Sequence, residues 1–259
     1  MEKSGCDKRG QVTIFIILAI VIVIGIAAFF ILRPSPSAEI SPRENPLAFI
    51  EKCMQDGIDE VLPSVLAQAG FAEIDKSPDK SLIYQDKHVH YLCYVEEELT
   101  LCTINTPMLK SEMETQLRKA TQPKLEGCFA KLKEEFSGYE YTESNLNYTI
   151  SISPNNLKAT AIKKITVSRD GLSQEFNSFI YETSSPIFDF LLLSNDILVD
   201  ELSCICGQES CTTDVLELSR FNPYFQISVF VAGNDEKVYT IKDTRSQQEF
   251  KFAVRNCIN

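Results

Sequence analysis

The pattern of hydrophobic and polar residues separates one long apolar segment near the N-terminus from a series of amphipathic elements that follow it. Residues 12–32 carry no charged side chain, and a helix of 21 residues, at about 1.5 Å per residue, crosses a hydrocarbon core of roughly 30 Å. Lys3, Lys8 and Arg9 lie just before this segment, and the excess of positive charge marks the cytoplasmic side of a span. We therefore expect residues 1–11 to form a cytoplasmic n-region and residues 12–32 a single-pass transmembrane helix in contact with membrane lipid.

Residues 33–46 are rich in proline, with Pro34, Pro36, Pro42 and Pro46 among serines and charged residues. Proline fixes φ and removes a backbone donor, so such a stretch forms neither helix nor sheet readily. We expect an extended, semi-rigid stalk that separates the membrane from the rest of the chain.

Two helical patterns follow within a predicted helical and hairpin subdomain over residues 47–140. Apolar residues recur at three- and four-residue spacing from Leu47, which predicts a helix ending near Gly70. A second pattern starts at Thr106-Pro107, and proline disfavours a helix interior. We therefore expect this second pattern to form two helices separated at Gln122-Pro123.

A β-hairpin is predicted between these helices. Residues 89–95 and 99–104 are rich in β-forming side chains and flank three consecutive glutamates. Antiparallel pairing would place the two runs side by side.

Strand patterns dominate residues 141–259. Tyr148, Ile150 and Ile152 alternate with polar residues, which predicts a strand with one buried face. We expect an antiparallel meander over residues 146–153, 157–167 and 175–181, a covering helix over 187–202, and strands over 224–231, 237–242 and 249–255. The predicted fold class is α+β: an N-terminal transmembrane helix, then a disulfide-stapled ectodomain with an antiparallel meander packed by helices.

Eight of the nine cysteines lie beyond the apolar segment, and Cys6 alone lies before it. An even set of cysteines outside the cytosol is typical of disulfides, so the partition predicts four disulfides in an oxidising compartment. The expected localisation is the cell membrane, with the N-terminus inside and the C-terminal domain extracytoplasmic.

Two disulfides can be assigned from the predicted elements. Cys93 and Cys102 are equidistant from the centre of the hairpin, and directly opposed residues have Cβ atoms about 4.5 to 5.5 Å apart, near the distance a disulfide needs. Cys53 and Cys128 lie on the apolar faces of their helices, so packing these faces together would pair them.

The last four cysteines allow two pairings: Cys204 with Cys257 and Cys206 with Cys211, or Cys204 with Cys211 and Cys206 with Cys257. The sequence does not choose between them, and we adopt the first. A four-thiolate zinc site is the alternative, but the CxC spacing is not that of a zinc knuckle.

Composition excludes one class of partner. The chain carries 25 Lys and Arg against 36 Asp and Glu, a net charge of −11. Nucleic-acid binding depends on clustered basic side chains, so no nucleic-acid partner is expected.

Few residues suggest chemistry. His88 and His90 would lie on one face of a strand, but two ligands are too few for a metal, and we expect this hairpin face to be exposed. Asn147 begins the only glycosylation sequon, Asn-Tyr-Thr. No catalytic motif or cofactor is predicted.

Lys8-Arg9-Gly10-Gln11, followed directly by Val12-Thr13-Ile14-Phe15, resembles the class III signal of archaeal prepilins. The resemblance implies a prepilin peptidase as a partner, with cleavage between Gly10 and Gln11. Two features depart from the pilins: Phe15 replaces a common glutamate, and Pro34 ends the apolar segment. The order of cysteine-bearing elements further resembles uncharacterised single-pass surface proteins of small-genome archaea.

Three functions are consistent with these observations. The first is a membrane-anchored extracytoplasmic protein that binds or scaffolds protein partners at the cell surface without catalysis. The second is a structural subunit of a type IV pilus-like filament, assembled through residues 12–32. The third is a metal-dependent extracytoplasmic enzyme that uses His88 and His90.

Overall fold

The structure, a computed structural model, describes residues 19–24, 41–203, 206, 223–233 and 236–257 of the chain. Residues 19–24 are helical and belong to a separate unit from residues 40–259. Within the described ranges no helix is both long and apolar enough to cross a membrane. The rest of the predicted transmembrane helix, the n-region and most of the predicted stalk lie outside the described residues.

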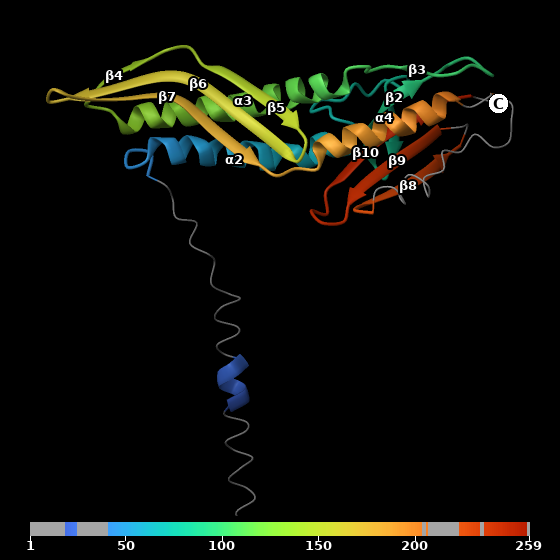
Figure 1. The fold of residues 1–259 in the computed structure, drawn as a ribbon, viewed down its shortest axis with the longest axis horizontal. Helices are drawn as coiled ribbons and strands as arrows, with labels where there is room; N and C mark the ends of the chain where they lie inside the picture. The colour runs from blue at the N-terminus through green and yellow to red at the C-terminus, as the bar shows by residue number, and fades with distance from the viewer. Residues whose placement is uncertain (1–18, 25–40, 204–205, 207–222, 234–235, 258–259) are drawn as a thin grey trace, which may run out of the picture. The chain divides into compact units, whose positions relative to one another are not determined.

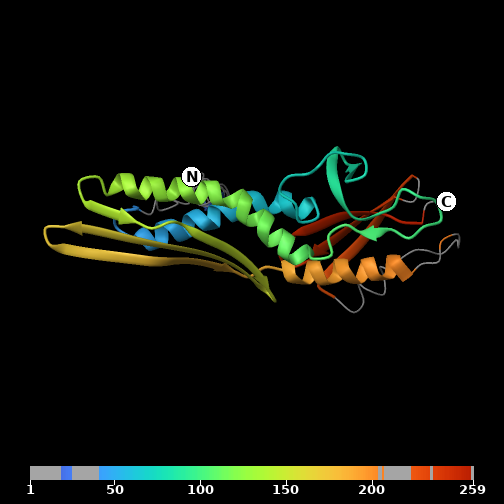
Figure 2. The ribbon, with the colours of Figure 1, turned by 90° about the horizontal axis from the view of Figure 1, so that it is seen from above.

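Two long helices, α2 (Pro46–Ala67) and α3 (Leu109–Glu135), pack side by side against the smaller of two sheets (Figures 1 and 2). The side chain of Asn45 caps α2 by accepting a hydrogen bond from the amide of Ala48 at 3.1 Å. Between α3 and the sheet, Phe129 meets Phe179 edge to face at 5.3 Å. These contacts place the apolar faces that the sequence predicts in one core.

α3 is a single helix, so the predicted break at Gln122-Pro123 is wrong. Leu117 and Leu125, on either side of Pro123, are both buried in the core. Their packing offsets the loss of one backbone hydrogen bond at the proline. Figure 2 shows that α3 changes direction part-way along, which is the usual effect of an internal proline.

The smaller sheet is the predicted antiparallel meander. Its strands are β5 (Asn147–Ser153), β6 (Asn156–Arg169) and β7 (Leu172–Thr183), and β4 (Glu140–Glu143) extends the same edge of β6 that β5 occupies. Tyr148, Ile150 and Ile152 are buried and their neighbours are exposed, as the alternation predicts.

The larger sheet has the strand order β1-β2-β10-β9-β8, with β3 paired to β2. Its strands are β1 (Ser81–Tyr84), β2 (Lys87–Tyr94), β3 (Thr103–Ile104), β8 (Phe225–Ala232), β9 (Glu236–Asp243) and β10 (Glu249–Arg255). β2 and β10 are parallel, and the other pairs are antiparallel. Strands from the two predicted subdomains thus share one sheet and one continuous core.

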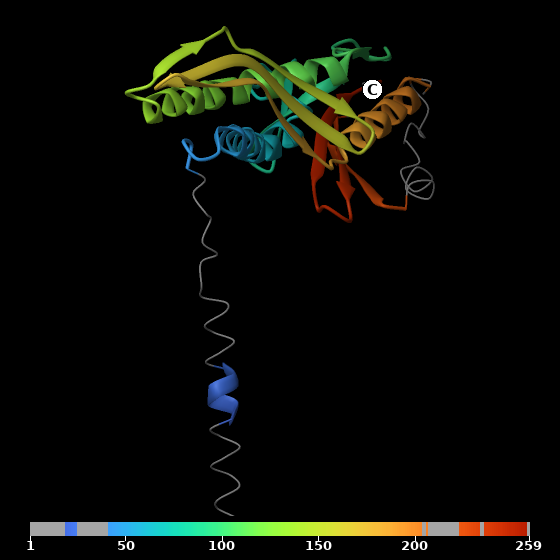
Figure 3. The same ribbon diagram turned by 60° about the vertical axis from the view of Figure 1, so that its left-hand side comes forward.

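Helix α4 (Ile187–Ser203) covers one face of the larger sheet, close to the expected helix over 187–202 (Figure 3). Phe190 of α4 lies 5.7 Å from Phe225 and 6.0 Å from Phe250, measured between ring centroids. At its other end, the last turn of α4 lies close to the start of β9 and to the end of β10.

Candidate functional site

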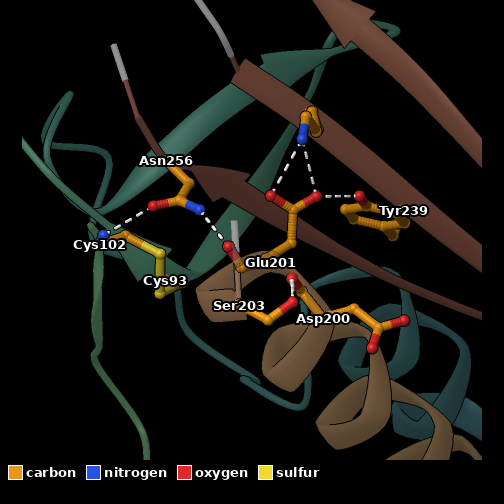
Figure 4. A network of polar contacts seen from close by, with 8 residues as sticks. Cys93, Cys102, Asp200, Glu201, Ser203, Tyr239 and Asn256 are labelled. Atoms are coloured by element: carbon orange, nitrogen blue, oxygen red, sulfur yellow. Dashed lines mark hydrogen bonds and ion pairs between the residues drawn. A yellow bond between two sulfur atoms is a disulfide. The ribbon is translucent and has the colours of Figure 1, made fainter. Parts of the chain in front are cut away.

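A buried ion pair joins the last turn of α4 to β9 (Figure 4). The side chain of Glu201 is 1 % exposed, and both of its carboxylate oxygens accept hydrogen bonds from Lys237 Nζ, at 2.8 and 2.9 Å. The hydroxyl of Tyr239 donates to the same carboxylate. A buried charge is costly unless it is paired and hydrogen-bonded, and these two partners meet that requirement.

Local structure explains why these side chains meet. Lys237 and Tyr239 are two residues apart on β9 and therefore point to the same face, the face that α4 covers. On α4, Glu201 continues the stripe of buried residues that includes Ile197 and Leu198. The position of a glutamate within an apolar helix stripe is the sequence pattern that could have identified Glu201 as a buried residue.

Asn256 extends this network to the hairpin of β2 and β3 (Figure 4). Its side-chain oxygen accepts a hydrogen bond from the amide of Cys102 at 2.8 Å, and its nitrogen donates to the backbone carbonyl of Glu201 at 2.5 Å. Asn256 is 4 % exposed, so both contacts are shielded from water. One side chain thus links α4, the end of β10 and the loop before β3.

Two disulfides flank Asn256. Cys93 bonds Cys102, with Cα atoms 5.4 Å apart, which matches the predicted pairing. The expected geometry is wrong in detail, because Cys93 lies opposite Ile104 in the ladder and Cys102 precedes β3.

The second disulfide joins Cys206 to Cys257, with Cα atoms 5.0 Å apart. This overturns the adopted pairing of Cys204 with Cys257 and of Cys206 with Cys211. Asn256 holds the residue before Cys257 against the last turn of α4, which places Cys257 near the segment after α4 that carries Cys206. Cys204 and Cys211 lie outside the described residues.

The third disulfide, between Cys53 of α2 and Cys128 of α3, is the one that the apolar helix faces predict. Its Cα atoms are 6.5 Å apart. Together the three bonds link α2 to α3, β2 to the loop before β3, and the end of β10 to the segment after α4.

The chemistry of this buried network is structural. Glu201 already binds Lys237 and Tyr239 and is almost fully shielded, so a substrate would have to displace both partners to reach it. Three aspartates also lie on α4, of which Asp196 and Asp200 are exposed and Asp189 is half-buried. Among the residues that the structure describes, no three His, Cys, Asp or Glu side chains converge as a metal site.

The two histidines occupy different surroundings on β2. His88 Nδ1 hydrogen-bonds the hydroxyl of Ser81, on β1, at 3.0 Å. His90 is only 9 % exposed and packs against Phe71, with ring centroids 4.1 Å apart and the ring planes tilted by 40°, so the exposed face expected for this hairpin is wrong for His90. The β1–β2 hairpin itself was not predicted, because its turn residues, Gln85 and Asp86, adopt positive φ without the usual Asn-Gly signal.

Stability is expected to depend on pH through His90. Burial lowers the pKa of His90, because it disfavours the imidazolium; Lys80 lowers it further and Asp75 opposes the shift. The folded state then binds a proton less readily than the unfolded chain, whose histidine titrates near 6.5, so stability is complete above that pH and falls as the pH drops below it. We expect the urea midpoint to fall between pH 7.5 and 5.5 by less in His90→Gln than in the wild type.

His88→Gln, a change two residues away on the same strand, is the matched control for this measurement. An identical loss of stability in the wild type and in His90→Gln would assign the pH dependence to other groups.

Asn147 is exposed on β5, which leaves the sequon accessible at the surface. Gly10 and Gln11, the predicted peptidase site, lie outside the described residues. No family model matches the chain, and no match was found among curated proteins or solved structures.

Proposed function

We propose that this chain is a membrane-anchored extracytoplasmic protein that binds or scaffolds partners at the cell surface without catalysis. The observation that carries the proposal is the state of the cysteines: all six in the described part of the chain are disulfide-bonded. Disulfides persist in oxidising compartments and are rare in the cytosol, so an exported domain is their natural setting.

The apolar N-terminal segment supports anchoring. Residues 19–24 are helical, and the side chains of Ile20, Val21, Ile22, Val23 and Ile24 are each more than half exposed. A helix that is apolar on every side requires an apolar environment, and the uncharged stretch over residues 12–32 is long enough for a bilayer to provide it.

The buried polar side chains at one end of the larger sheet favour a rigid binding surface. Glu201, Lys237 and Asn256 bind one another or nearby backbone instead of facing an open cavity. Such an arrangement joins α4, β9 and the loop before β3 to one another, which favours recognition by a preorganised surface.

Intact mass spectrometry of the protein from its native membrane tests this proposal. Alkylation without reduction should leave the described cysteines unmodified, and reduction should add about two daltons per disulfide, one for each sulfur. Loss of residues 1–10 would identify cleavage at Gly10 and Gln11.

Recovery of the chain in the soluble fraction with alkylated Cys53, Cys93 or Cys206 would contradict the proposal. Residue-specific mapping of the alkylated peptides separates these cysteines from Cys6, which is the internal control for a cytoplasmic thiol in any chains that retain residues 1–10.

A further inference from the structure

Two arginines converge on one tyrosine at the end of the molecule where α2 begins. Arg43 precedes α2, Tyr139 follows α3, and Arg169 ends β6. The Tyr139 hydroxyl accepts hydrogen bonds from Arg43 at 2.5 Å and from Arg169 at 3.3 Å. Both guanidinium carbons also lie over the tyrosine ring, at 5.2 and 5.0 Å from its centroid.

The two positive charges are close together. Both donor nitrogens lie within 3.3 Å of one oxygen atom, so they are separated by no more than twice that distance. Each guanidinium has five N–H donors and Tyr139 engages one from each, which leaves further donors for another acceptor. The same two hydrogen bonds, first that of Arg169 and then that of Arg43, lower the pKa of Tyr139, as expected beside concentrated positive charge.

Negative groups balance this pair only in part. Asp170 lies 3.4 Å from Arg169 Nε, and its side chain is 86 % exposed. For Arg43, no carboxylate lies within 4.0 Å in the part of the chain that the structure describes. A different environment surrounds Arg245, which stacks on Tyr224 at 4.6 Å but pairs with the buried carboxylate of Asp243.

A surface pocket of about 530 Å³ adjoins the two arginines. Phe136, Val167 and Leu172 form apolar parts of its wall, Ser173 and Gln174 contribute neutral polar groups, and Asp170 contributes one carboxylate. Leu172, the first residue of β7, is 80 % exposed, whereas Phe136 and Val167 are each 5 % exposed, so Leu172 supplies most of the apolar surface that is open to solvent. The pocket therefore combines two guanidinium groups with one accessible apolar side chain over a buried apolar floor.

We propose that Arg43, Tyr139 and Arg169 form a binding site for a phosphate-class anion carried by an organic group. A guanidinium group can donate two parallel hydrogen bonds to two oxygens of one phosphate. The apolar residues of the pocket can contact the organic group that the phosphate carries. An anion between the arginines also relieves their mutual repulsion. This inference names a ligand for the binding role proposed above and rests on it.

Isothermal titration of the full-length chain in nonionic detergent tests the site. The soluble probes are inorganic phosphate and glycerol 1-phosphate, and the membrane probe is a nanodisc of phosphatidylglycerol compared with one of phosphatidylcholine. We expect saturable binding of at least one probe, weakened by about tenfold or more in Arg43→Gln and in Arg169→Gln, because each change removes a charged hydrogen-bond donor.

Arg245→Gln is the matched control, since it removes a stacked arginine outside the pocket, and its affinity should equal that of the wild type. Arg43→Lys keeps the charge but removes the fork, and should bind more weakly than the wild type and more tightly than Arg43→Gln. Circular dichroism of each variant verifies that the fold is retained.

The probes separate two sources of the anion. Binding of glycerol 1-phosphate identifies a soluble phosphoester, whereas binding only to phosphatidylglycerol nanodiscs identifies a lipid headgroup. No saturable binding of any probe, or equal affinities in the wild type and both Gln variants, would overturn this site. Because the disulfide state and N-terminal processing are measured separately, that outcome would leave the surface-anchored role standing.

Discussion

Replacing Glu201 by Ala should lower the free energy of unfolding by about 3–5 kcal/mol, because the buried charge of Lys237 would lose the carboxylate that accepts two of its hydrogen bonds. Tyr239 would also lose the hydrogen bond that its hydroxyl donates to Glu201. Urea denaturation followed by circular dichroism measures the effect, since the chain contains no tryptophan for fluorescence.

An exposed ion pair provides the control. Lys158 and Glu182 lie on neighbouring strands with side chains 38 % and 48 % exposed, and Glu182→Ala should cost about 1 kcal/mol or less. Replacing the whole buried pair, with Glu201→Leu and Lys237→Met together, should restore much of the stability lost in Glu201→Ala. If Glu201→Ala cost no more than Glu182→Ala, the buried pair would not be a stabilising contact.

Removal of the disulfide between α2 and α3 should be the second large effect. The chain-entropy model gives about 4.5 kcal/mol for the bond between Cys53 and Cys128, which are 75 residues apart. The same model gives about 2.6 kcal/mol for Cys93 and Cys102, which are 9 residues apart. Changing both cysteines of a pair to Ala avoids a free thiol, and the two double variants can be compared by the same urea denaturation.

The order of these two losses is the informative result. A greater loss for the short loop would mean that the packing of the buried Cys93 and Cys102 side chains outweighs loop entropy. The reduced wild type at high thiol concentration should be less stable than either variant, because it lacks the described disulfides together.

Local patterns predicted much of the secondary structure. The alternation at Tyr148, Ile150 and Ile152 identified β5, because successive side chains of a strand point to opposite faces of the sheet. In β5 one face packs on the core and the other faces solvent. Proline was a less reliable guide: Pro123 suggested a helix end, but the packing of Leu117 and Leu125 keeps α3 continuous.

The candidate sites were predicted less well. His88 and His90 were singled out by residue type, but the two side chains have different neighbours in the structure. His88 contacts the hydroxyl of Ser81, and His90 is buried against Phe71. Glu201 was not predicted as a site residue despite its place in an apolar stripe, since a single glutamate on a helix is usually exposed. Its burial depends on Lys237 and Tyr239, which come from a distant strand.

By itself the sequence determined the α+β class, the main strands and helices, and the pairs Cys93 with Cys102 and Cys53 with Cys128. The elements follow from residue periodicity, which is a local property, and the two cysteine pairs were inferred from the position of each cysteine within its predicted strand or on its apolar helix face. Only the tertiary structure decided that Cys206 bonds Cys257, that β2 pairs in parallel with β10, and that Arg43 reaches Tyr139 across 96 residues. The physical reason is that these contacts depend on how whole elements pack, and no local pattern along the chain records which distant surfaces will meet.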